Sequence, residues 1–140
     1  MPTILFQRVH NVSHFQIDLL VKGAKMTEHD VGGTLVAFAP GHINVATAWD
    51  ENGAVPPLVE IIVSGYEMLP AAGIDGIIPV ASGLLDVGAG GVEVGNYITS
   101  DVASLAVPQG QYGVTVFVDN LEPMTARRVQ FHFRNSATSQ

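Results

Sequence analysis

The sequence predicts an all-β fold, a two-sheet antiparallel β-sandwich with at most one short helical turn. About eight or nine short segments have the composition or alternation of strands, and turn residues recur about every 8–12 residues. No segment keeps the 3.6-residue period of an amphipathic helix. Because several strands alternate apolar and polar side chains, each is expected to have one buried face and one face in water.

The clearest alternation lies in the second half of the chain. From residue 112 one face is apolar, and its predicted core residues are Tyr112, Val114, Val116 and Val118. Segment 128–134 alternates in the same way, with Val129, Phe131 and Phe133 inward and Arg128, Gln130, His132 and Arg134 outward. Pro108 and Gly110 predict a tight type II turn at 108–111, because proline fixes φ and glycine accepts a positive φ.

Strands are also predicted in the first half of the chain. Residues 4–9 form a short apolar run, and in segment 14–22 alternate residues are apolar, namely Phe15, Ile17, Leu19 and Val21. Segments 34–39 and 42–49 predict a pair of strands joined at Pro40-Gly41. Residues 26–31 predict the short helical turn, since Thr27 can cap it and Glu28 and Asp30 suit its positive end.

The remaining segments are shorter or irregular. Residues 58–63 and 77–81 predict strands, the second at a sheet edge because of Pro79, and 92–94 and 97–99 predict extended chain. Residues 83–91 contain four glycines and predict a flexible hairpin connection. Loops, connections or a frayed tail are predicted at 50–57, 66–76, 120–126 and 135–140.

Composition indicates one domain over residues 1–140, with 47% hydrophobic residues and enough chain for a proper core. The chain has no cysteine, which excludes disulfides and thiolate chemistry. No secretory signal is recognisable at the N-terminus, and no apolar run reaches the length of a membrane span. We therefore expect a cytoplasmic protein that does not insert in a membrane.

The charge distribution predicts a class of partner. The net charge is −7, and between residues 26 and 126 there is no lysine or arginine. Nucleic acid is not expected as a partner, because phosphate binding requires a basic surface. A basic protein fits better, since a field of one sign speeds encounter with the opposite charge. The alternative is that scattered acids only keep an apolar domain soluble.

Catalytic and metal-binding patterns are weak. The five histidines, His10, His14, His29, His42 and His132, lack the spacing of a recognisable metal site. No Gly-x-Ser-x-Gly motif occurs, and the adjacent carboxylates Asp50 and Glu51 lie in a predicted loop where nothing raises a pKa. We expect a protein that is not an enzyme and has no cofactor or bound metal. A metal or small-ligand protein using the histidines, and a homo-oligomer that self-associates through an apolar edge such as 77–81, are the alternatives.

Several short motifs resemble a known family. They are His14-Phe15, Thr27-Glu28 leading to Gly33, Pro40-Gly41-His42-Ile43, Pro79-Val80, Gly91-Val92-Glu93-Val94 and Pro108-x-Gly110-x-Tyr112. In their order and spacing the chain resembles the competence protein J family, small bacterial proteins that include an inhibitor of a nuclease acting in DNA uptake. The resemblance implies a cytoplasmic β-sandwich that binds and neutralises a protein partner, such as a nuclease or a related toxin.

The acid-only segment agrees with that implication, because the DNA groove of a nuclease is cationic and an acidic surface can compete for it. Charge and position, rather than the family, select the expected contact residues. These are Glu28, Asp30, Asp50, Glu51 and Glu93.

Overall fold

The fold is a two-layered β-sandwich, seen in a computed structural model that describes residues 3–11, 16–24, 36–47, 58–66, 78–96, 101–122 and 126–135. Within these ranges there are ten strands and no helix. The strands are β1 (Thr3–Asn11), β2 (Gln16–Val21), β3 (Val36–Ala39), β4 (His42–Ala46), β5 (Leu58–Tyr66), β6 (Ile78–Val87), β7 (Val92–Asn96), β8 (Asp101–Leu105), β9 (Gly110–Val118) and β10 (Arg128–Asn135). The sandwich class predicted from the alternation is confirmed.

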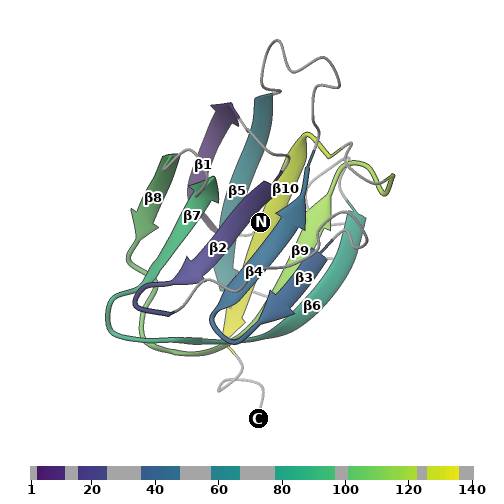
Figure 1. Cartoon of the computed structure of the whole chain (residues 1–140). Coiled ribbons are helices and arrows are strands. Elements are labelled where there is room, and N and C mark those ends of the chain that lie inside the picture. Colours follow the sequence, from purple (N-terminus) through teal and green to yellow (C-terminus); the bar gives the residue numbers. More distant parts are fainter. Residues whose placement is uncertain are drawn as a thin grey trace.

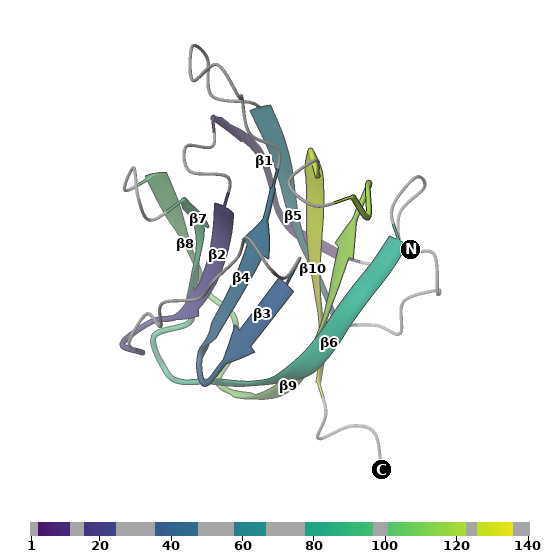
Figure 2. The same cartoon turned by 45° about the vertical axis from the view of Figure 1, so that its right-hand side comes forward.

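Each layer contains five strands (Figure 1). Sheet 1 has the order β1-β5-β10-β9-β6, and sheet 2 has the order β3-β4-β2-β7-β8. Every pairing is antiparallel except that of β5 with β10, which is parallel. At the two sides of the sandwich the edge strands meet, β3 with β6 and β1 with β8, and Figure 2 shows β3 beside β6.

The core lies between the sheets and is formed by the residues that alternation predicted. Sheet 1 contributes fully buried side chains from β9 and β10, and sheet 2 contributes them from β2 and β4. These residues are Tyr112, Val114, Val116, Val118, Val129, Phe131, Phe133, Ile17, Leu19, Ile43 and Val45. Burial of each large apolar side chain stabilises the fold by about 1.5–3 kcal/mol, so this two-residue periodicity fixes which face of each strand turns inward.

Parts of the outer faces of the central strands are buried, contrary to the expectation that these faces lie in water, whereas Arg134 on the outer face of β10 is exposed. Asp18, His42 and Asn44 lie on the outer face of sheet 2 and are at most 3% exposed. On the outer face of sheet 1, Gln130 is fully buried and His132 is 3% exposed. The expectation failed because alternation reports which side chains face the core and not whether the other face is covered.

Two predicted turns have different outcomes. The turn at Pro40-Gly41 is confirmed: Gly41 has a φ of 73°, and its carbonyl accepts a hydrogen bond from the backbone N–H of Val21 at 2.8 Å. The type II turn at 108–111 is wrong, because Gly110 has a φ of 158° and begins β9. Instead, the hydroxyl of Tyr112 donates to the carbonyl oxygen of Pro108 at 2.6 Å and fixes this approach to the strand.

The boundaries around the glycine-rich segment also differ from expectation. The strand expected at 77–81 is confirmed at the edge of sheet 1, but it continues as β6 to Val87. The connection is therefore limited to residues 88–91, and β8 at 101–105 was not predicted. The predicted helical turn at 26–31, the loop at 50–57, the extended chain at 97–99 and most of segment 66–76 lie outside the described residues.

We predict that Gly91→Ala lowers the free energy of unfolding by at least about 2 kcal/mol. Gly91 has a φ of 79°, and a Cβ there would collide with the backbone carbonyl of Leu105. Gly88, in the same connection, has open space around its Cα, so Gly88→Ala should leave stability almost unchanged. Urea denaturation of both variants measures this, and equal effects would contradict it.

Candidate functional site

The two sheets carry different charges. The five strands of sheet 2 contain the acids Asp18, Glu93 and Asp101 and no lysine or arginine. The strands of sheet 1 contain Glu60 and Asp86 but also Arg8, Arg128 and Arg134. Arginine occurs on the strands of one layer only, because β1 and β10 bring Arg8, Arg128 and Arg134 into sheet 1.

Glu93 is the predicted contact residue that the structure describes. It lies on β7, opposite Leu20 of β2 and Ser104 of β8. Its neighbours Val92 and Val94 are fully buried in the core, so Glu93 points to the outer face of sheet 2, where it is partly exposed. The other four, Glu28, Asp30, Asp50 and Glu51, lie outside the described residues, so their distances to Glu93 stay untested.

A buried polar cluster on the same outer face was missed by the sequence analysis. Asp18 Oδ1 accepts hydrogen bonds from His42 Nε2 at 2.8 Å and from Asn44 Nδ2 at 2.6 Å, and Gln16 Nε2 donates to Asp18 Oδ2 at 2.9 Å. These three donors replace the water that the carboxylate loses on burial. The sequence held a signal, since Gln16 and Asp18 alternate on one strand and His42 and Asn44 on another. Only the register of β2 against β4 shows that they meet.

A second buried cluster lies on the outer face of sheet 1. Gln130 Nε2 donates to Ser64 Oγ at 2.7 Å, and Ser64 Oγ lies 2.8 Å from His132 Nδ1. Although serine and histidine are adjacent, Ser64 is fully buried, so the pair has no surface at which to meet a substrate.

The histidine alternative finds no cluster in the described ranges. No three His, Asp or Glu side chains among those residues form a group that could hold a metal ion. His42 lies on the outer face of sheet 2 and His132 on that of sheet 1, so the sandwich separates them. Across the same ranges there is also no helix long and apolar enough to cross a membrane.

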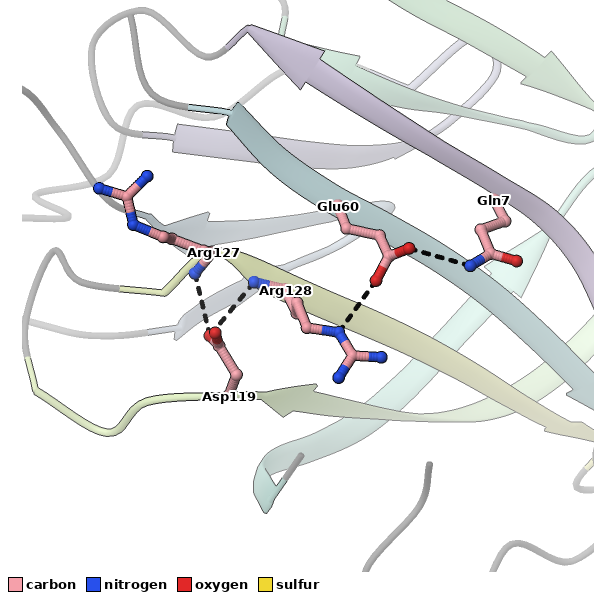
Figure 3. A network of polar contacts seen from close by, with 5 residues as sticks. All are labelled: Gln7, Glu60, Asp119, Arg127 and Arg128. Atoms are coloured by element: carbon pink, nitrogen blue, oxygen red, sulfur yellow. Dashed lines mark hydrogen bonds and ion pairs between the residues drawn. The ribbon is translucent and has the colours of Figure 1, made fainter. Parts of the chain in front are cut away.

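An ion-pair network crosses three strands of sheet 1 (Figure 3). Glu60 accepts from Gln7 Nε2 and from Arg128 Nε, both at 2.9 Å. The hydrogen bond from Gln7 and the bond and charge of Arg128 lower the pKa of Glu60, although partial burial opposes them. Asp119 Oδ1 accepts from the backbone N–H groups of Arg127 and Arg128 at 2.9 and 3.1 Å. Glu60 links β1, β5 and β10, and Asp119 links the end of β9 to the start of β10. Both carboxylates therefore bind within sheet 1 rather than to a partner.

The chain was compared with known proteins. No family model and no curated protein matches it. Among solved structures, it is similar to the crystal structure of ComJ, inhibitor of the DNA degrading activity of NucA, from Bacillus subtilis. The TM-score is 0.64 at 14% sequence identity, and the alignment covers 96% of this chain and 98% of that chain. At this identity the likeness shows the fold, and at that level it confirms the resemblance to the competence protein J family.

We predict that Asp18→Asn lowers the free energy of unfolding by about 2–3 kcal/mol, because it removes charge-assisted hydrogen bonds in a buried site. The new amide would also set a donor against the Gln16 amide that now donates to Asp18 Oδ2. The matched control is Asp86→Asn, the same change at an exposed position, with an expected effect within about 0.5 kcal/mol. Urea denaturation at neutral pH compares them, and equal stabilities would contradict a structural role for the cluster.

We predict a pH-dependent contribution from Glu60, whose pKa lies below its ordinary value of 4.5. A lowered pKa means that the carboxylate stabilises the fold above the unfolded pKa and that this stability disappears as the pH falls through the folded pKa. Glu60→Gln should therefore be less stable than the wild type above about pH 4.5, by less than about 1 kcal/mol, and the two should converge in acid.

The variant Gln7→Ala separates this effect from simple loss of packing. Gln7 is the first cause of the lowered pKa, so in this variant the pKa of Glu60 should rise. An NMR titration of the Glu60 side chain measures the shift. A pKa that is the same in the wild type and in Gln7→Ala would show that the network does not hold the charge.

Proposed function

We propose that this chain is a non-catalytic protein that binds and neutralises a basic nuclease or toxin through the acidic side of sheet 2. The observation that carries the proposal is the likeness, over almost the whole of both chains, to a solved inhibitor of a DNA-degrading nuclease. A shared fold alone does not determine function, so the charge of the surface has to support the same conclusion independently.

The charge distribution gives that support. On sheet 2 the structure describes Glu93 as a partly exposed acid, and the strands of this sheet contain no lysine or arginine, whereas the arginines of the described strands are in sheet 1. A nuclease groove that holds DNA must be cationic, because it contacts phosphates. An acidic protein surface steers toward such a groove and competes with DNA for it.

The proposed contact contains five acids, of which the structure describes Glu93. The other four are proposed from their position in the acid-only segment, and they are Glu28, Asp30, Asp50 and Glu51. On the same outer face as Glu93, the buried Asp18 cluster ties β2 to β4 through hydrogen bonds. A surface built on packed strands holds its charges in fixed positions, which favours tight binding because little order is lost on association.

Capture of the partner tests the proposal directly. The purified chain, immobilised, should retain a basic protein from extracts of the cell that encodes it, and that protein should degrade DNA or act as a toxin. Adding the free chain should abolish degradation of plasmid DNA by the captured protein. If the captured protein is acidic, or if its activity is unchanged by an excess of the chain, the proposal is wrong.

Charge reversal tests the surface. We predict that Glu93→Lys slows association with the captured protein roughly threefold to tenfold at low ionic strength, and less at high salt. Glu122→Lys changes the net charge equally but lies in the exposed loop between β9 and β10 of sheet 1. A double variant, Asp50→Lys with Glu51→Lys, applies the same measurement of association rate to the two acids of the loop predicted at 50–57. Equal rates for Glu93→Lys and Glu122→Lys, measured by stopped flow, would exclude sheet 2 as the contact.

A further inference from the structure

The outer row of β6 is exposed, whereas Gln130 and His132 on the outer face of the central strand β10 are buried. Ser82, Leu84 and Asp86 all point away from the core and are exposed, and Leu84 is 66% exposed. On β9, the residue opposite Leu84 is Gly113, which has no side chain to cover the leucine. A large apolar side chain therefore stands at the edge of sheet 1, with a hydroxyl two residues before it and a carboxylate two residues after it.

The backbone of β6 is paired on one side. It bonds to β9, and no described strand bonds to its other side. Its inner face is closed, since the ring of Phe38 on β3 packs so near Gly83 that a Cβ there would lie 2.8 Å from it. Pro79 and the register shift between Pro79 and Ala81 limit regular pairing to residues 81–87. A strand edge that has no neighbour among the described residues is a template for another strand.

We propose that a second copy of this chain pairs with β6 in antiparallel fashion, about a twofold axis at Leu84. In this register Leu84 faces Leu84 of the second copy, and Ser82 faces Asp86 of the second copy at both ends. The contact buries the exposed leucines and lets each serine hydroxyl donate to a carboxylate, so no two carboxylates are opposite each other. Sheet 1 of each copy then continues into one ten-stranded sheet.

The pattern favours this register over the others. A parallel, in-register pairing would place the two Asp86 carboxylates side by side, which is repulsive. An antiparallel slip of two residues would place each Leu84 against an Asp86 in one direction or a Ser82 in the other, and a slip of one residue would turn the outer row toward the wrong face. Because the sequence Ser-x-Leu-x-Asp is complementary to itself only when centred on leucine, a twofold dimer satisfies both copies with the same contact.

The contact is small, so the dimer should be weak. A single strand edge buries less surface than a standard stable interface, and we expect a dissociation constant of about 1–100 µM. The dimer uses the edge of sheet 1 and leaves the acidic side of sheet 2 exposed. It therefore stands or fails independently of the proposed inhibitor function.

Sedimentation equilibrium of the full chain tests the dimer from about 1 µM to about 500 µM. The wild type should change from monomer to dimer across this range, and Leu84→Arg should weaken the dimer at least about tenfold. Leu121→Arg, at an exposed leucine in the loop after β9, is the control and should leave association unchanged. A wild type that stays monomeric, or equal effects of both variants, would overturn the proposal.

The register has its own test. Ser82→Lys places a cation opposite Asp86 of the second copy and should tighten the dimer roughly twofold to tenfold, whereas Ser82→Asp should weaken it by a similar factor. Since the chain has no cysteine, Leu84→Cys should form a disulfide-linked dimer across the axis under mild oxidation. Val9→Cys, 53% exposed on the edge strand β1 of the same sheet, is the control.

Three outcomes of these tests overturn self-pairing. The first is cross-linking of Leu84→Cys that is no faster than that of Val9→Cys, and the second is the same sign of effect for both Ser82 variants. The third is a monomeric wild type whose binding to the captured nuclease or toxin is lost in Leu84→Arg, which would make this edge a contact for the partner instead.

Discussion

The structure depends on the burial of the inward face of β10. Phe131 and Phe133 are fully buried, and the ring of Phe133 meets that of Tyr112 edge to face at a centroid distance of 5.5 Å. This strand lies at the centre of sheet 1, parallel to β5 and antiparallel to β9. Because side chains alternate, fixing the phenylalanines inward places Gln130 and His132 on the outer face, where they pair with Ser64 of β5. The packing of the core thus dictates where the polar cluster forms.

The same logic applies to sheet 2, with a different chemical result. Ile17 and Leu19 turn inward on β2, so Asp18 between them must turn outward, and there it is fully buried. A buried carboxylate is stable only with donors around it, and β4 supplies them through His42 and Asn44. A one-residue slip of β4 against β2 would leave Asp18 without these donors. Such clusters add little net stability, but they penalise wrong registers, which is how a polar group can specify a β-sheet.

Period-two alternation predicted the sandwich class and nearly all inward-facing residues of β9 and β10, because burial of one face leaves a direct trace in the sequence. The structure at Gly110 was not predicted. Proline and glycine indicated a turn, whereas the hydroxyl of Tyr112 donates to the carbonyl of Pro108 and the chain at Gly110 is already extended. The extension of β6 through Gly83 escaped for a different reason: that glycine makes room for the ring of Phe38. The Asp18 cluster was not predicted, because it depends on the register between two strands. The assignment of Glu93 to sheet 2 was not predicted either, because it depends on the order of the strands in the sheets.

Topology also turns a chain with acids along most of its length into a molecule with two different layers. The arginines lie near the ends of the sequence, and the sheet order brings β1 and β10 into the same layer, separated only by β5. There Glu60 binds Arg128, and Asp119 binds the backbone at the start of β10, so acids of sheet 1 serve its own cohesion. Sheet 2 has no lysine or arginine on its strands, and its Glu93 is partly exposed on the outer face. The acid proposed for partner recognition, Glu93, and the leucine proposed for strand-edge pairing, Leu84, belong to different sheets, so the two proposed contacts can be changed separately by mutation.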